Sequence, residues 1–285
     1  MNQQLKPTGD RKTAFWEGQK NTYGLLPGRD GTCPGCTEGP GGCAHIAPGR
    51  KIPACYVFNT MACYSGVRPV LQHNTDLLKQ TAHTSRTSSS DARTIEILKA
   101  EFKRFRDTEL RHAQKTGTDP MLFYRLHWSG DIFDRNYAAC LATAMSAFPD
   151  VRFWAYTRTF PIAGDLAENT PNLTLYLSLD KVNFDQGMQT YFDWLHSPHK
   201  ADNLQICYMS PFNDFPEAYE AAYWRRRIAM ALAGGKDGHA EWPAPFSQVE
   251  LRVCPVDAGK LPLKGGCSKC RMCLNPKPAA VWFMS

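Results

Sequence analysis

The sequence predicts an α/β fold, built as a partial or complete barrel of the TIM type, with a doubly wound open sheet as the alternative. Strand-like and helix-like segments alternate between residues 121 and 254, and neighbouring parallel strands need crossovers long enough to hold a helix. The chain has 285 residues, of which 43% are apolar, so it can bury one full-sized core. One large domain, or one domain with a small appendage, is therefore expected.

Each segment is assigned from its own pattern. A helix is expected over residues 91–115 because Ile95, Leu98 and Phe102 recur on one helical face. The stretch MLFYRLHW at 121–128 is largely apolar and aromatic, which is typical of a strand buried on both faces. The predicted strands are 121–128, 151–157, 173–179, 204–210 and 249–254, and the other predicted helices are 134–148, 186–196 and about 216–233.

The eleven cysteines are expected to be unpaired thiols. The chain begins with the hydrophilic stretch MNQQLKPTGDRKT and has no apolar run of membrane-spanning length, which predicts a soluble, intracellular protein with no membrane partner. A reducing cytosol keeps ordinary thiols unpaired. The formal charge of +6 is small and diffuse, so it permits a polyanionic partner without requiring one. Cys140 and Cys207 lie in a predicted helix and a predicted strand, where each is most simply a small core residue.

Four cysteines near the C-terminus carry the more specific metal-binding pattern. Two residues separate Cys267 from Cys270, and two more separate Cys270 from Cys273, so three sulfurs can converge from one tight loop. Cys254 can close the site from the end of the last predicted strand. Four thiolates without a histidine fit either a 4Fe-4S cluster or a tetrahedral zinc ion.

A second, looser group lies in GTCPGCTEGPGGCAHIAPGRKIPACY, residues 31–56. Its cysteines are Cys33, Cys36, Cys43 and Cys55, and Cys63 follows shortly after. Glycine and proline fill the intervals, so the segment is expected to form neither a helix nor a regular strand. A metal centre is the natural organiser of such a loop, and His45 is a further possible zinc ligand.

Polar residues also follow four of the predicted strands at the point where each ends. In an α/β architecture the carboxyl ends of the strands meet at one edge, where ligand sites form. Any one of these residues could instead cap a helix or form a turn, but together they predict the floor of a pocket. The residues are Ser129, Gly130, Asp131, Thr157, Arg158, Ser178, Asp180 and Ser210.

The order of several short motifs resembles that of the phage-encoded gene product eighty-eight proteins. It resembles, more distantly, phage proteins of radical-SAM type in which a cysteine trio ends in Cys-Tyr. The resemblance covers most of residues 20–284. Its motifs are CPG at 33–35, Cys43, Cys-Tyr at 55–56, HWSGDIFD at 127–134, PDVRFWAYTRT at 149–159 and the Cys-Pro at 254–255 with its CxxCxxC tail.

This resemblance implies two domains. Residues 1–253 would form a radical-SAM-like barrel with its cluster loop at 31–63, and residues 254–285 would form an extension that holds an auxiliary 4Fe-4S cluster. In the barrel, a 4Fe-4S cluster bound by three cysteines would leave one iron open for S-adenosylmethionine (SAM).

The sequence does not decide which cysteines bind the first cluster. The motif alignment nominates Cys33, Cys43 and Cys55, whereas Cys36 could replace Cys33 or complete a closed four-thiolate centre. The resemblance further implies that Asp131 holds the SAM ammonium or ribose hydroxyls. The residues expected to hold the remainder of SAM or the substrate are Thr157, Arg158, Ser178 and Asp180, and Ser129 and Gly130 are expected to belong to the same cofactor site. Arg158 could bind a carboxylate or phosphate through two hydrogen bonds, or it could instead form a salt bridge to a neighbouring loop.

Two functions follow. The first is a radical-SAM-like phage enzyme that forms a 5'-deoxyadenosyl radical from SAM, fed by an electron donor such as a flavodoxin or ferredoxin. The expected reaction is the modification or isomerisation of a nucleotide or a hypermodified DNA base in the cytoplasm of an infected host. The second is a non-enzymatic iron-sulfur or zinc-binding protein that binds nucleic acid or a host protein. The basic stretch at 224–227 could contact phosphates, although such runs are usually solvated helix faces.

Overall fold

The computed structural model of the chain describes most of the sequence. The described residues are 4–9, 12–46, 48–49, 51, 53–83, 88–198, 202–210, 250–256, 260–273 and 279–284. The helix expected at about 216–233, together with the basic stretch inside it, lies outside these residues. In the described part of the chain, no helix is long and apolar enough to cross a membrane.

Six parallel strands form one sheet in the order β1-β2-β3-β4-β6-β5. The strands are β1 (Phe123–Arg125), β2 (Arg152–Thr157), β3 (Leu173–Leu179), β4 (Leu204–Ser210), β5 (Glu250–Val253) and β6 (Ala279–Met284). The first five lie within segments predicted as strands. The last was not predicted, and it inserts between β4 and β5, so the C-terminal segment contributes a strand to the sheet.

Helices surround this sheet. They are α1 (Tyr56–Cys63), α2 (Val67–His83), α3 (Ser88–Thr116), α4 (Arg135–Ser146), the 3-10 helix η1 (Phe160–Ile162), α5 (Ala163–Glu168), α6 (Phe184–Leu195) and α8 (Gly266–Cys270). Asp134 begins α4 by accepting a hydrogen bond from the Tyr137 backbone N–H at 2.7 Å. The long α3 corresponds to the helix expected at 91–115.

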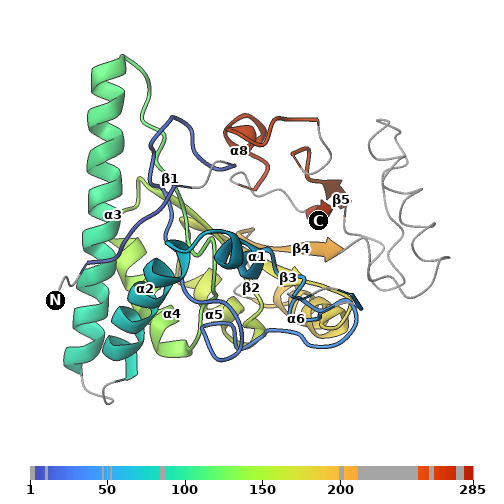
Figure 1. Ribbon diagram of the computed structural model, residues 1–285. Coiled ribbons are helices and arrows are strands. Elements are labelled where there is room, and N and C mark those ends of the chain that lie inside the picture. The colour runs from blue at the N-terminus through green and yellow to red at the C-terminus, as the bar shows by residue number, and fades with distance from the viewer. Residues whose placement is uncertain are drawn as a thin grey trace.

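One face of the sheet packs on α4, α5 and α6 (Figure 1). Alternate residues of β3, including Leu175 and Leu177, are fully buried against Leu141, Leu166 and Met188 of these helices. Helices that follow successive strands and cover the same face are typical of barrel-like winding, since a doubly wound sheet carries helices on both faces. Closure of the sheet into a barrel stays a prediction.

The opposite face carries a second apolar cluster. Tyr176, Cys207 and Val281 project from β3, β4 and β6, and they pack against Cys254 and Val256 after β5. Figure 1 shows α8 on this side of the sheet, away from α4, α5 and α6. The C-terminal cysteine segment therefore lies against one face of the sheet.

A buried polar cluster joins the N-terminal segment to the end of β1. The Nε2 atom of His127 lies 3.1 Å from the Tyr23 hydroxyl and 2.7 Å from the Tyr137 hydroxyl, and the two hydroxyls are 2.6 Å apart. His127 has a φ of 52°, which is uncommon for a residue with a side chain. Complete burial, with the nearby charge of Arg125, lowers the pKa of His127 to about 3.

The lowered pKa of His127 predicts loss of stability in acid. Its folded-state pKa lies below the ordinary value, so the unfolded chain takes up the proton first as pH falls below about 6.5. The unfolding free energy should therefore decrease towards pH 4 in both proteins, but more steeply in the wild type than in His127→Asn. The difference between the two slopes should be about 1.4 kcal/mol per pH unit. Asparagine tolerates the positive φ. Urea denaturation at pH 7, 6, 5 and 4.5 measures the difference, and parallel curves for the two proteins would contradict it.

Candidate functional site

The N-terminal cysteine loop lies against the residues that follow β2 and β3. A Cβ atom on Gly35 would come within 2.0 Å of the Arg158 carbonyl oxygen, so only glycine permits this contact. Gly41 has a φ of 86°, and a Cβ there would lie 2.8 Å from the Cβ of Lys181. Two glycines therefore let the loop approach the carboxyl edge of the sheet closely.

Inside the loop, four thiols lie near one another. The sulfur atoms of Cys36 and Cys43 are 3.4 Å apart, and the Cys55 backbone N–H donates to the Cys43 carbonyl oxygen at 2.9 Å. Cys33 is close enough to Cys43 and Cys55 for the charge of each to act on it. No disulfide joins the described cysteines. The structure thus brings together Cys33, Cys36, Cys43 and Cys55, whereas Cys63 is exposed at the end of α1.

The thiols do not ionise equally. A hydrogen bond with Cys36 lowers the pKa of Cys43, and the Arg158 charge and Thr37 act in the same direction against the effect of burial. The same hydrogen bond raises the pKa of Cys36, and burial adds to the increase. Burial also raises the pKa of Cys33 and of Cys55. The surroundings therefore favour Cys43 as the thiolate of the pair, because Arg158 and Thr37 act on Cys43 to lower its pKa.

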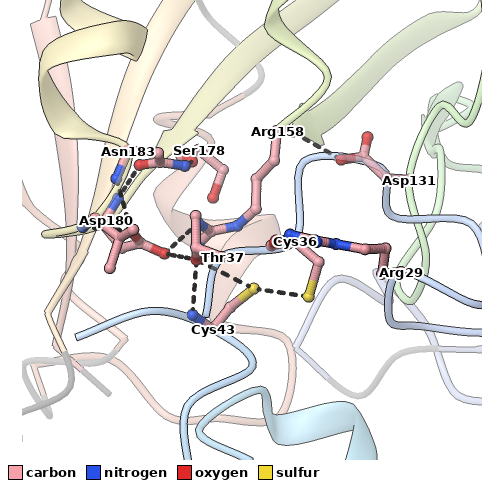
Figure 2. Close-up of polar contacts among 10 residues, drawn as sticks. Arg29, Cys36, Thr37, Cys43, Asp131, Arg158, Ser178, Asp180 and Asn183 are labelled. Carbon is pink, nitrogen blue, oxygen red and sulfur yellow. Dashed lines mark hydrogen bonds and ion pairs between the residues drawn. The ribbon is translucent and has the colours of Figure 1, made fainter. Parts of the chain in front are cut away.

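A buried ion pair holds the loop to the sheet. Figure 2 shows the Arg158 guanidinium and the Thr37 hydroxyl converging on the Asp180 carboxylate, with Cys43 and Cys36 alongside. The Thr37 hydroxyl donates to Asp180 at 2.5 Å and accepts the backbone N–H of Cys43 at 2.9 Å. Nη1 of Arg158 pairs with Asp180 and also reaches Thr37. Thr37 thus links the ion pair to the thiol loop.

Arg158 is only partly satisfied by these contacts. Its side chain is 9% exposed, and its Nη2 atom is buried with no hydrogen-bond partner. Arg158 lines a small, partly open pocket together with two of the thiols, Cys43 and Cys55. The pocket is lined by Gly41, Gly42, Cys43, Ala54, Cys55, Arg158, Asp180 and Met209.

Asp131 lies next to Arg158 and already accepts hydrogen bonds with both of its carboxylate oxygens. One of its carboxylate oxygens accepts the Thr157 hydroxyl at 2.6 Å and the Ile132 backbone N–H at 2.7 Å, and the other accepts the Arg158 backbone N–H at 2.7 Å. Burial raises the pKa of Asp131 to about 6, against these hydrogen bonds. Asp131 therefore positions the end of β2, and its predicted contact with SAM stays a prediction.

The remaining predicted pocket residues lie around the same edge. The Ser129 hydroxyl donates to the Leu25 carbonyl oxygen at 2.7 Å, and a Cβ on Gly130 would meet the Thr32 hydroxyl at 2.4 Å. The Asn183 side-chain amide donates to the Ser178 carbonyl oxygen at 3.2 Å. Ser210 is the last residue of β4, and its side chain lies outside the described part of the structure.

The C-terminal cysteines form a separate group on the face of the sheet. Cys254, Cys267 and Cys273 are close enough to act on one another electrostatically, and Cys270 is close to Cys273. Burial raises the pKa of Cys267 and of Cys273 to about 12. Cys273 accepts a hydrogen bond from Tyr156 of β2, which fixes the loop after α8 against the sheet.

Cations lie beside this second group as well. The positive charges of Lys12 and Arg125 both act to lower the pKa of Cys267, and the Cys267 backbone N–H donates to the Lys12 carbonyl oxygen at 3.0 Å. As it stands, the described structure holds no three His, Cys, Asp or Glu side chains in a metal-binding arrangement. Metal ligation by the eight grouped cysteines stays a prediction.

Three further residues at the site were not predicted. Thr37 is the polar link just described, Met209 lines the pocket, and Cys207 lies between the two cysteine groups, near both Arg158 and Cys273. The sequence carried a signal for two of them, since Cys207 and Met209 point to the same face of β4 by the two-residue period of a strand. Nothing in the sequence distinguishes Thr37 from other loop threonines.

Comparison with known proteins gives the family. The family model described as Gene product 88 matches residues 2–276. The chain belongs to the Gene product 88 family. Two relatives are both called Gene 88 protein: one from Mycobacterium phage D29, 32% identical over 64% of this chain and 70% of its own length, and one from Mycobacterium phage L5, 30% identical over the same shares. No solved structure matches the chain.

The close contact at Gly35 predicts that a methyl group there displaces the loop. In Gly35→Ala the Cβ would clash with the Arg158 backbone, so Cys36, which is 6% exposed in the native protein, should become open to alkylation. Mass spectrometry after a short iodoacetamide pulse should show faster labelling of Cys36 than in the wild type. Gly66→Ala is the control because a Cβ there meets nothing within 4 Å. Equal protection of Cys36 in all three proteins would contradict the contact.

Proposed function

We propose that this Gene product 88 protein is an iron-sulfur enzyme of radical-SAM type. The proposal rests chiefly on one observation: a loop with four thiols lies at the carboxyl edge of a parallel sheet, and two of them, Cys43 and Cys55, line a pocket with a buried, partly unsatisfied arginine. Active sites form at this edge in parallel α/β folds. A purely structural metal site has no need of such a pocket.

The residues of the loop fit a metal–thiolate centre. Reduced cysteines supply the soft donors, and Arg158 offsets negative charge from one side. We assign Cys33, Cys43 and Cys55 as the ligands of a 4Fe-4S cluster. Cys36 is then a buried thiol that donates a hydrogen bond to the Cys43 sulfur, in line with its raised pKa. Three ligands leave the open position that a catalytic centre needs.

The protein's own groups would prepare the pocket. When bound, the cluster would supply the electron that cleaves SAM to give a 5'-deoxyadenosyl radical. Asp180 and Thr37 hold the guanidinium of Arg158 at the pocket wall, and Asp131 fixes the backbone from which Arg158 projects. Ala54 and Met209 provide an apolar wall, which excludes water around a reactive species.

The second cysteine group would serve as an auxiliary centre. We assign Cys254, Cys267, Cys270 and Cys273 as its four ligands, which leaves no open position and suits structure or electron relay. A flavodoxin or ferredoxin would deliver electrons, and a nucleotide or DNA base would be modified or isomerised in the cytoplasm of the infected host. The phage source of both named relatives supports that setting.

One observation favours a second candidate, a non-enzymatic metal-binding protein. Two thiolates on one tetrahedral zinc ion, with zinc–sulfur bonds of about 2.3 Å, lie ~3.8 Å apart. The Cys36 and Cys43 sulfurs are 3.4 Å apart, which is close to the spacing on one zinc ion. Thiolates that bind different irons of a cluster lie farther apart than this. All four N-terminal cysteines would then close the site around zinc.

Anaerobic purification separates the two candidates. The enzyme proposal expects iron and acid-labile sulfide, and release of 5'-deoxyadenosine when SAM and dithionite are added. A colourless protein with zinc and no sulfide would overturn it in favour of the second candidate. Iron with no 5'-deoxyadenosine under several reductants would also overturn it, since the cluster would then have no catalytic role towards SAM.

The assignment of three ligands predicts different effects of two neighbouring substitutions. Cys43→Ser removes a ligand, so iron and sulfide at the N-terminal centre should be lost while those at the C-terminal centre remain. Cys36→Ser should keep both centres because a serine hydroxyl can still donate to the Cys43 sulfur. Iron and sulfide analysis after anaerobic reconstitution makes the comparison. Loss of iron in Cys36→Ser to the same extent as in Cys43→Ser would show a four-thiolate site.

A further inference from the structure

The strongest unexplained feature of the pocket is the unused half of the Arg158 guanidinium. Nη1 is occupied by Asp180 and Thr37, whereas Nη2 is buried and has no partner. Buried donors are almost always hydrogen-bonded in native proteins, and one left unpaired on a charged group is costly. A ligand that accepts from Nη2 would remove that cost.

The neighbouring carboxylates cannot serve this atom without giving up other bonds. One oxygen of Asp180 accepts from Arg158 Nη1 and Thr37, and the other accepts the backbone N–H groups of Val182 and Asn183. Asp131 is likewise occupied by the three donors described above. Neither carboxylate can therefore supply the missing acceptor without losing a bond that it already makes.

The surroundings of Nη2 indicate the chemistry of that acceptor. Arginine N–H groups bind carboxylate and phosphate oxygens with charge-assisted hydrogen bonds. Glycines 41 and 42 bring no side chains into the pocket, and Ala54 and Met209 form an apolar wall. The Nη2 atom itself is buried, so its attraction to an opposite charge is stronger than it would be at the surface.

We propose that the pocket binds an oxyanion, a carboxylate or phosphate group of the substrate, through Nη2 of Arg158. This proposal adds that the substrate of the proposed enzyme carries a negative charge, and in that respect it rests on the proposed function. The binding event itself requires neither iron nor SAM, so it can be measured whether or not SAM is cleaved.

Inorganic phosphate and acetate are suitable probes of this site. Their effect on the thermal midpoint of the full-length, anaerobically purified protein is titrated at constant ionic strength against chloride. Saturable stabilisation by either anion is expected; phosphate alone would indicate a phosphorylated substrate, and acetate alone a carboxylate. Titration curves that do not saturate would show only general exclusion of salt and would overturn the proposal.

Variants place the effect at Arg158. Arg158→Gln should abolish the saturable part, and Arg158→Lys, which keeps the charge for Asp180, should bind the anion about tenfold or more weakly. If Arg158→Gln does not fold, Arg158→Lys decides the question. Arg135→Gln is the control because Arg135 pairs with Asp165 on the surface. Equal anion binding in Arg158→Lys and the wild type would overturn the proposal.

Discussion

The arrangement of the site depends on one buried ion pair, between Arg158 after β2 and Asp180 after β3. The two side chains are 9% and 2% exposed, so each needs the other to offset the loss of hydration. Removing one partner of a buried pair typically costs about 3–5 kcal/mol. The pair also fixes Thr37, and Thr37 in turn holds the backbone of Cys43. The thiol loop, which has almost no regular secondary structure, is thereby tied to the most regular part of the protein.

The sheet gives the two cysteine groups a common face. Tyr156, Tyr176 and Cys207 lie on the side of the sheet away from α4, α5 and α6. Cys273 contacts this layer through Tyr156. Cys207 is affected by the charge of Arg158 and itself acts on Cys273. This shared face explains why cysteines more than 200 residues apart in sequence belong to one region of the molecule.

The sequence predicted those features that depend on local pattern. Apolar runs such as 173–179 gave β3 with the right bounds, and the polar residues at strand ends do lie at one edge. The insertion of β6 between β4 and β5 could not be predicted, because it is a pairing between segments that the local pattern does not relate. The role of Asp131 also differs from simple expectation. A carboxylate at a strand end looked available for a ligand, but its oxygens are taken up by Thr157 and by backbone N–H groups that the fold brings to it.

The central claim is that both cysteine groups hold iron through sulfur. X-ray absorption at the iron edge of the anaerobically purified protein tests it most directly. In the absence of SAM, the account predicts that the iron atoms have sulfur neighbours, apart from one light atom at the open position. It also predicts the short iron–iron scattering of a cluster. Iron surrounded mainly by oxygen and nitrogen, or a protein that contains no iron, would contradict it.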